Sequence, residues 1–386
     1  MSLTPRQRIV MFRQLQQLFK QQQTAETKAK IKHLTEKFNY LGIETCAATG
    51  LCEQECPVGI NTGDLIRELR GLQHQQSSSV AKWSSDHFAL STRLAKATFS
   101  MQNLFTLPLP NHMVNGLGRL MHKVTKNKLP LWSSSYPTPS KSRLSATKIS
   151  DDKVIFMPSC SSRVMGTQAS ASDQRSLNDV TISLLEKAGY QVLIPKQQNE
   201  LCCGMPYNSQ GLTELAGQKS QQLEQVLTEL SEQGDYAILM DASPCKQFSD
   251  QAFTDNKLSI YEPFEFIEQH LLDRLSIQQN DETIMLHITC SSQKMGLSEK
   301  ILNVANRCAS EVIIPEDISC CGWAGNKGFT TPELNASALK NLKQQIPAQC
   351  RRGFSNSLTC EIGLSQHGGI PYQSILYLLD EVSAKT

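Results

Sequence analysis

The sequence lacks the features of several common protein classes. No apolar run reaches the ~18 residues of a membrane-spanning helix. The first residues, MSLTPRQRIVMFRQLQQLFKQQQ, are polar and Gln-rich, without the apolar core of a signal peptide. The net charge is only +2, so no nucleic-acid partner is expected. Walker, G-x-G-x-x-G and G-x-S-x-G motifs are missing, and no residue set is typical of a hydroxy-acid site. The chain itself therefore predicts no FAD or NAD site.

Cysteine, in contrast, is abundant. The chain of 386 residues, long enough for two or three domains, holds 13 Cys. The missing signal peptide predicts a cytoplasmic location, where disulfides are rare and thiols serve metal or redox chemistry. An odd number of Cys also fits metal ligands plus spare thiols better than a fully paired framework.

One cysteine pattern occurs twice. LCCG at residues 201–204 and SCCG at residues 319–322 each have one Cys upstream and one downstream. Adjacent thiolates can bind neighbouring metal atoms of one cluster, and the glycine lets the backbone pass close to the sulfurs. We therefore expect a metal cluster at each set, with structural zinc in one of the sites or inert buried thiols as alternatives. The two sets are Cys160, Cys202, Cys203 and Cys245, and Cys290, Cys320, Cys321 and Cys360.

The segments around each set predict an α/β fold. Apolar strands alternate with amphipathic helices in the same order in both halves, which favours parallel sheets. The Cys residues follow strand ends, where open parallel sheets place their ligand sites. We expect two tandem cysteine-rich α/β domains, at residues 151–275 and 276–386.

Residues 1–76 predict a small helical domain of partial ferredoxin type, with two amphipathic helices over 5–40. In TCAATGLCEQECPVG, Cys46, Cys52 and Cys56 match the ferredoxin pattern C-x2-C-x2-C-x3-C-P, except that Thr49 stands at the second ligand position. In two-cluster ferredoxins the fourth Cys serves the other cluster, and no second loop of this kind occurs. The loop is a candidate cofactor site without its partners; three buried or free thiols are the alternative.

Residues 77–150 predict a linker or loop-rich segment over the other domains. Pro, Gly and Leu mix there with little periodicity. A contact with a membrane surface or on the quinone side is the alternative, because apolar residues including Trp132 stand beside basic ones. Those basic residues are Arg119, Lys123, Lys126 and Lys128.

Other residues near the two sets are interpreted as structural. Cys308 and Cys350 are expected in the core, with a fifth ligand as the alternative for Cys350. His287 and His367 are expected to be satisfied structural residues, with proton handling beside the cluster as the alternative. Aromatic residues that follow the Cys pairs are expected to cover the sulfurs: Tyr207, Trp323 and Phe329.

These motifs resemble a known family. The two C-C-G patterns are similar to the cysteine-rich domain shared by the cysteine-rich subunit of heterodisulfide reductase, the glycolate oxidase iron-sulfur subunit and the lactate-utilisation iron-sulfur proteins. More of the chain resembles the C-terminal half of FAD-linked, quinone-dependent D-lactate dehydrogenases. The likeness covers nearly the whole chain, most loosely residues 75–150, and rests on CAATGLCEQECPVGINTGDLIRELR, FMPSC, HITCSS, DASPC, IYEPFEFI and SNSLTCEIGLSQHGGIPY.

The resemblance implies the iron-sulfur (4Fe-4S type) electron-transfer portion of a D-lactate-type 2-hydroxy-acid dehydrogenase. It implies the two sets of four Cys as ligands, no catalytic residue in this chain, and transfer from flavin to quinone or cytochrome. LTPRQRIV resembles the stretch after the family's first ferredoxin loop, so FAD is expected on a missing domain or a partner subunit. Ala242 and Ser357 stand where the usual C-x2-C ending has its first Cys.

Two other functions stay open at this point. One is a disulfide reductase like the cysteine-rich subunit of heterodisulfide reductase, and the other is a zinc-stabilised scaffold that docks a dehydrogenase. The expected location is cytoplasmic, or peripheral at the inner face of the membrane.

Overall fold

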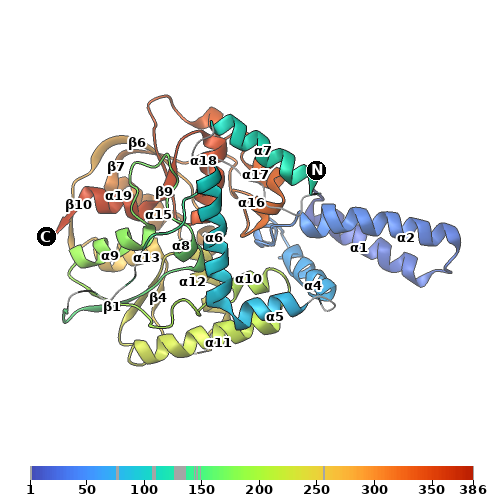
Figure 1. The fold of residues 1–386 in the computed structure, drawn as a ribbon, viewed down its shortest axis with the longest axis horizontal. Coiled ribbons are helices and arrows are strands. Elements are labelled where there is room, and N and C mark those ends of the chain that lie inside the picture. Colours follow the sequence, from blue (N-terminus) through green and yellow to red (C-terminus); the bar gives the residue numbers. More distant parts are fainter. Residues whose placement is uncertain are drawn as a thin grey trace.

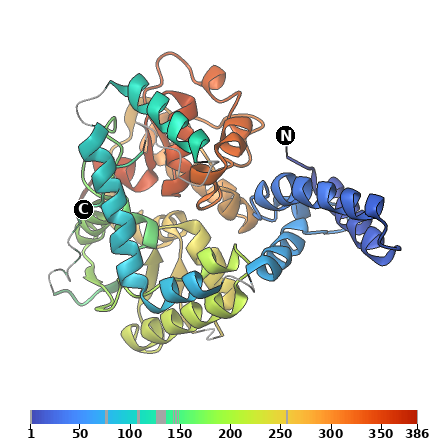
Figure 2. The ribbon, with the colours of Figure 1, turned by 45° about the vertical axis from the view of Figure 1, so that its right-hand side comes forward.

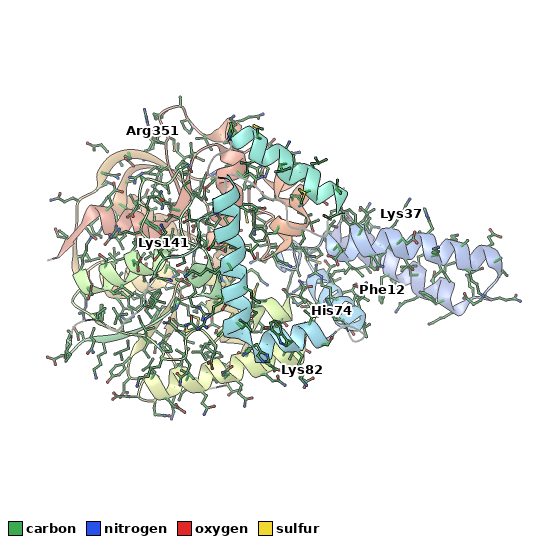
Figure 3. The ribbon with its side chains drawn as sticks, in the orientation of Figure 1. Phe12, Lys37, His74, Lys82, Lys141 and Arg351 are labelled. Atoms are coloured by element: carbon green, nitrogen blue, oxygen red, sulfur yellow. The ribbon has the colours of Figure 1, made fainter. Side chains whose placement is uncertain are left out.

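The computed structural model describes residues 2–74, 78–106, 110–125, 136–142, 144, 147, 149–254 and 257–385. A helical hairpin projects from an α/β body (Figure 1). It consists of α1 (Pro5–Lys20) and α2 (Ala25–Phe38), as the sequence predicts for 5–40. A capping box at Thr4 begins α1, and Thr24 caps α2. Figure 3 labels Phe12 and Lys37 on this hairpin.

The predicted ferredoxin-type loop follows the hairpin. A π-helical turn, η1 (Asn39–Glu44), leads into it, and α3 (Leu51–Gln54) and α4 (Thr62–His74) come next. Arg70 on α4 is only 2% exposed. Its guanidinium donates to the carbonyl oxygens of Ile43 (2.8 Å), Cys46 (2.7 Å) and Ser209 (2.8 Å). One buried cation thus ties the loop to the α/β body.

The first cysteine-rich domain is a four-stranded parallel sheet in the order β2-β1-β3-β4. Val154, Ile155 and Phe156 in its central strand are fully buried, as expected where helices cover both faces. The strands are β1 (Lys153–Met157), β2 (Gln191–Leu193), β3 (Ala237–Met240) and β4 (Ile260–Tyr261). The helices are α8 (Cys160–Val164), α9 (Leu177–Lys187), α10 (Met205–Asn208), α11 (Thr213–Leu230), α12 (Ser243–Ala252) and α13 (Pro263–Phe266).

The second domain repeats this topology in the order β7-β6-β8-β9, again parallel. The predicted α/β fold with two parallel sheets is therefore confirmed. The strands are β6 (Asn280–Leu286), β7 (Ala309–Ile313), β8 (Gly353–Ser355) and β9 (Tyr372–Ser374). The helices are α14 (Cys290–Lys294), α15 (Ser298–Cys308), α16 (Lys327–Thr330), α17 (Pro332–Ala338), α18 (Leu358–Gly368) and α19 (Ile375–Val382), with a 3-10 turn η3 (Lys343–Gln345). A π-helical turn η2 (Ile267–Leu271) and an antiparallel pair, β5 (Leu275–Ile277) with β10 (Ser383–Lys385), complete the junction.

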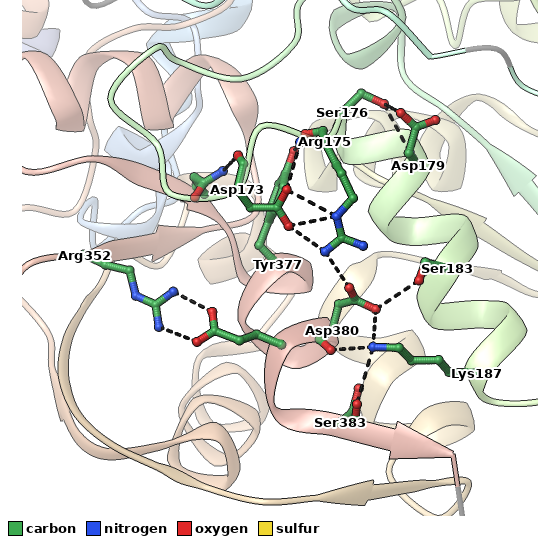
Figure 4. Close-up of polar contacts among 12 residues, drawn as sticks. Asp173, Arg175, Ser176, Asp179, Ser183, Lys187, Arg352, Tyr377, Asp380 and Ser383 are labelled. Atoms are coloured by element: carbon green, nitrogen blue, oxygen red, sulfur yellow. Dashed lines mark hydrogen bonds and ion pairs between the residues drawn. The ribbon is translucent and has the colours of Figure 1, made fainter.

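The two domains share one apolar core, which runs from β1 and α9 to β6, α15 and α19. Polar contacts at its edge add to the apolar packing of α9 on α19 (Figure 4). Asp380 on α19 is buried and pairs with Arg175 (2.8 Å) and Lys187 (2.7 Å). The domains therefore form a single packed body.

The expectation of a loop-rich segment at 77–150 is wrong for residues 78–106 and 111–124. Three helices occupy this stretch: α5 (Ser78–Asp86), α6 (Phe88–Thr106) and α7 (Asn111–Val124). Pro110 directly precedes α7, and Gly116 and Gly118 are tolerated within α7. Pro108 lies outside the described residues. Trp132, Lys126 and Lys128 lie outside the described residues. None of the described helices is both long and apolar enough to cross a membrane.

Candidate metal centres

Each upstream Cys begins a short helix directly after a central strand. Ser159 caps α8, because its Oγ accepts a hydrogen bond from Ser162 N (3.2 Å). Thr289 caps α14 in the same way, accepting from Ser292 N (3.3 Å). This strand–cap–Cys order places Cys160 and the equivalent Cys290 at the carboxyl ends of β1 and β6.

The C-C-G turns need glycine for two reasons. Gly204 has φ +97° and Gly322 has φ +71°, both in the left-handed region. A Cβ on Gly204 would lie 2.3 Å from the carbonyl oxygen of Ala216, and one on Gly322 would lie 2.7 Å from that of Leu334. The turns therefore pack directly on the backbones of α11 and α17.

The same turns aim backbone amides at sulfur. Gly204 N donates to Cys202 Sγ (3.4 Å), and Gly322 N donates to Cys320 Sγ (3.3 Å). Hydrogen bonds of this kind stabilise a negatively charged thiolate sulfur and tune the potential of a metal centre bound to it.

The four thiols of the first set form a row. The thiol of Cys160 interacts with that of Cys202, the thiol of Cys202 with that of Cys203, and the thiol of Cys203 with that of Cys245. The contact with Cys202 and burial raise the pKa of Cys160 well above its usual value. The contact with Cys160 lowers the pKa of Cys202, but the Cys203 contact and burial outweigh it and raise that pKa to about 12. A small pocket opens on this row, lined also by Met157, Arg163, Leu223 and Met240.

The second set forms the corresponding row, from Cys290 to Cys320, Cys321 and Cys360. It contains one further donor, the imidazole of His287. The donor atoms of His287, Cys321 and Cys360 all lie within 4.8 Å of one another. Contacts with the Cys321 thiol and the His287 ring lower the pKa of Cys360 to about 6, against the effect of burial.

His287 is the site residue that sequence reasoning undervalued. It is 1% exposed, and among the described residues its Nε2 has no hydrogen-bond partner. The expected satisfied structural histidine is therefore wrong at this atom. A signal existed in the repeat: three residues before the upstream Cys, the first domain has Met157 and the second has His287.

The side chains behind the two rows also differ in charge. In the first domain, Asp241 accepts from Ser159 N (2.7 Å) and from the Ser162 hydroxyl. Burial raises the pKa of this carboxyl group. In the second domain the same position, four residues before the downstream Cys, is Asn356. Its amide donates to Ser292 Oγ (2.9 Å) and to the buried Glu262 (2.6 Å).

The surroundings of the two rows touch each other. The hydroxyl of Ser243, two residues before Cys245, lies 2.9 Å from Thr289 Oγ1 and 2.6 Å from Ser291 Oγ. Thr289 and Ser291 flank Cys290. The two thiol sets are therefore neighbours, separated by a buried layer of hydroxyl groups.

The predicted ferredoxin-type loop is arranged differently. Cys46 Sγ accepts from Ala48 N (3.3 Å), and Cys52 Sγ lies 3.3 Å from Thr62 Oγ1; Cys56 is half-buried. These partners are not the other thiols of the loop. Within the described chain, the one group of three donor atoms that are mutually within 4.8 Å does not include them. No three donor atoms of the first thiol row meet this 4.8 Å criterion either. In that row, however, each thiol contacts the next one along the row.

The other cysteines, the second histidine and the aromatic residues near the two rows have the following places. Cys308 is fully buried in the shared core, as predicted, and Cys350 is 4% exposed, with its thiol 3.4 Å from the Arg352 carbonyl oxygen. His367 is half-buried near the end of α18. The aromatic covers are as predicted, because Tyr207 packs in one apolar cluster with Cys202, and Trp323 and Phe329 pack in one with Cys321.

Segment 77–150 supplies two more covers, which the sequence did not reveal. Phe88 at the start of α6 is buried in the cluster that contains Cys202. Tyr136 packs edge-on against Trp323 and Phe329, with ring centres 6.1 and 5.1 Å apart. The segment therefore shields both thiol rows from water.

Comparison with known proteins agrees with this geometry. The family model of the CCG cysteine-rich domain matches the chain twice, over residues 154–248 and 284–365, and each match contains one complete thiol set. A search of curated proteins found no match. The chain thus carries two copies of the CCG cysteine-rich domain, a domain of metal-binding and electron-transfer type that occurs in proteins associated with oxidoreductases.

Proposed function

We propose that this chain is the iron-sulfur electron-transfer portion of a larger oxidoreductase. The observation that carries the proposal is the duplicated row of four thiols, each with a glycine turn that donates N–H groups to sulfur. Thiolates select iron-sulfur centres, zinc or copper(I) among protein metals. A bound iron-sulfur centre would accept and release single electrons.

The donor chemistry fits such a group. Cys160, Cys202, Cys203 and Cys245 would hold one centre, and Cys290, Cys320, Cys321 and Cys360, with His287, the other. In each row two thiols are buried and two are half-buried. The pKa values of all four thiols in the first row are raised above the ordinary thiol value, so these thiols are neutral at pH 7 without a metal. Metal binding would therefore release protons and strengthen as pH rises. Aromatic covers exclude water, and the contact from Ser243 to Thr289 keeps the sites adjacent.

The finer proposal is a D-lactate-type 2-hydroxy-acid dehydrogenase. It rests on the resemblance of the motifs around Cys46, Cys160 and Cys360 to that family. The flavin and the substrate site would then lie on another domain or a partner subunit, and quinone or a cytochrome would accept the electrons. The Cys46–Cys56 loop would contribute a third centre only with ligands from that domain or subunit.

The test is anaerobic purification with iron, sulfide and zinc analysis and EPR of the reduced protein. We expect iron and sulfide, with EPR signals that a Cys202→Ser, Cys203→Ser variant reduces and the control Cys308→Ser retains. Stoichiometric zinc without iron would overturn the proposal. The chain alone should not reduce dye with D-lactate, because no flavin site is proposed on it; adding the flavoprotein partner should restore dye reduction.

A zinc site in the second domain is the second candidate. The compact group of His287, Cys321 and Cys360 favours it, because nitrogen and sulfur donors in one small cluster suit tetrahedral zinc. Iron at the first set together with zinc that a Cys321→Ser variant loses would support this version.

A further inference from the structure

Helix α7 (Asn111–Val124) presents an apolar stripe to solvent. Five of its large side chains are about half exposed or more, at sequence steps of four, three, one and three, which place them on one face of a helix. They are Met113 (51%), Leu117 (50%), Leu120 (58%), Met121 (48%) and Val124 (71%).

Helices α5 and α6 extend this apolar exposure. Among the described residues, 17 large hydrophobic side chains are exposed, and nine of them fall between residues 80 and 124. Besides the α7 stripe they are Val80 (75%), Trp83 (43%), Leu90 (45%) and Leu94 (53%). Helices α6 and α7 lie on the outside of the body in both views (Figures 1 and 2). Lys82, labelled in Figure 3, accompanies Trp83 on α5.

The charge of this part of the chain is predominantly positive. Residues 78–150 contain ten of the chain's 38 Lys and Arg and only one of its 36 Asp and Glu, Asp86 on α5. The other residues together are therefore net acidic, although the whole chain is nearly neutral. Arg119 lies on α7 itself and is exposed.

The exposed apolar stripe and the positive charge together indicate what binds this surface. A second copy of this chain would bring two strongly positive segments face to face, which is repulsive. An in-plane helix with apolar residues on one side and Lys or Arg beside them is the pattern that binds anionic lipid. Trp83 of α5 is exposed as well, and tryptophan suits the headgroup region of a membrane.

We propose that α7, with the exposed side chains of α5 and α6, binds the surface of a membrane that contains anionic phospholipids. The apolar stripe enters the boundary between headgroups and acyl chains, and the basic residues contact the headgroups. Binding does not depend on a metal in the thiol rows. Because Phe88 of α6 also covers Cys202, the same segment would place the first thiol set near the membrane.

The test is flotation of the full chain with vesicles of phosphatidylcholine, alone or mixed with phosphatidylglycerol. We expect binding to the mixed vesicles, weaker at high salt because headgroup attraction is screened. A Leu117→Glu, Leu120→Glu variant should bind at least about tenfold more weakly, since two leucines that enter the lipid become charged. Phe19→Glu is the matched control, because Phe19 is 61% exposed on α1 outside this surface.

Three results would overturn the proposal: no flotation of the wild-type chain, equal flotation of the double variant, or the same loss in Phe19→Glu. Light scattering after size-exclusion chromatography tests whether a second copy of the chain binds the stripe instead. A dimer that the double variant converts to monomer would assign the stripe to self-association instead. Circular dichroism of each variant shows whether it is folded.

Discussion

At the scale of single residues, one position makes the two repeats chemically different. Met157 and His287 both stand three residues before the upstream Cys, at the end of a central strand. A thioether leaves the first site with sulfur donors alone. An imidazole adds a nitrogen donor to the second, and histidine ligation raises the potential of an iron-sulfur centre relative to all-thiolate ligation. The two sites are therefore expected to differ in potential despite their common fold.

This difference predicts a nitrogen signature. With metal loaded anaerobically and histidine labelled with nitrogen-15, pulsed EPR should detect nitrogen coupled to one centre. His287→Gln should abolish the coupling and weaken metal retention at the second site by about 10–100-fold. His367→Gln, in the same domain, should keep both. A centre without nitrogen coupling would refute His287 as a donor and leave the thiol sets standing, whereas a chain that binds no metal would refute the proposed function.

At the scale of secondary-structure elements, the α9–α19 packing joins the two domains. Asp380 on α19 is 4% exposed and pairs with Arg175 and Lys187. These cations are 46% and 31% exposed, so the pairs are partly screened. Asp380→Asn should lower the free energy of unfolding by about 1–3 kcal/mol, less than for a fully buried pair. The neighbouring Glu381 has a side chain that is 51% exposed, and it pairs with Arg352. Glu381→Gln should therefore lower the free energy of unfolding, measured in urea, by less than about 1 kcal/mol. Equal losses would contradict the assignment of Asp380 to the domain junction.

The buried carboxyl group of Glu262, which caps α13, predicts that the stability of the fold depends on pH. Burial raises the pKa of Glu262 from 4.5 to about 7, although its carboxyl group accepts from Glu265 N and Asn356. The folded chain keeps this proton where the unfolded chain has lost it, so the stabilisation is full below pH 4.5 and is lost as pH rises towards 7.

Glu262→Gln removes this titration while keeping an oxygen that can accept from Glu265 N. The unfolding free energy of the variant minus that of wild type should rise by up to about 3 kcal/mol between these pH limits. Urea unfolding at several pH values measures it, with Glu381→Gln as the control. A difference that does not vary with pH would contradict the raised pKa.

At the scale of the whole molecule, the repeated strand and cysteine motifs could be predicted from the sequence. The features that depend on packing between distant segments could not. The strand–Cys order and the C-C-G turns are local, so the parallel sheets and the grouping of thiols could be predicted. The helices at 78–106 and 111–124 were missed because their exposed apolar residues and flanking prolines resemble a loop. The contact between Ser243 and Thr289 arises only when the two domains pack together. The lack of a partner for His287 Nε2 among the described residues depends on the side chains that surround it in the folded second domain.

The attachment of the Cys46–Cys56 loop is the clearest case of such long-range packing. Arg70 joins Ile43 of η1 and Cys46 of the loop to Ser209, which follows the first C-C-G turn. Its burial lowers the pKa of the guanidinium. A lysine cannot reach all three carbonyl oxygens, so Arg70→Lys loses one or two charge-assisted hydrogen bonds of about 1.5–3 kcal/mol each.

Hydrogen exchange should therefore be at least about tenfold faster in Arg70→Lys, in residues 43–56 and 209–211, and unchanged in β1 and β6. Arg13→Lys is the matched control, because it makes the same change at an exposed arginine on α1. Unchanged exchange at 209–211 in Arg70→Lys would mean that the loop is held on the body by other contacts. Lys294, whose Nζ lies beside Gly50, and Lys327, which pairs with Glu44 at 2.6 Å, would then be the residues that dock the loop on the second domain.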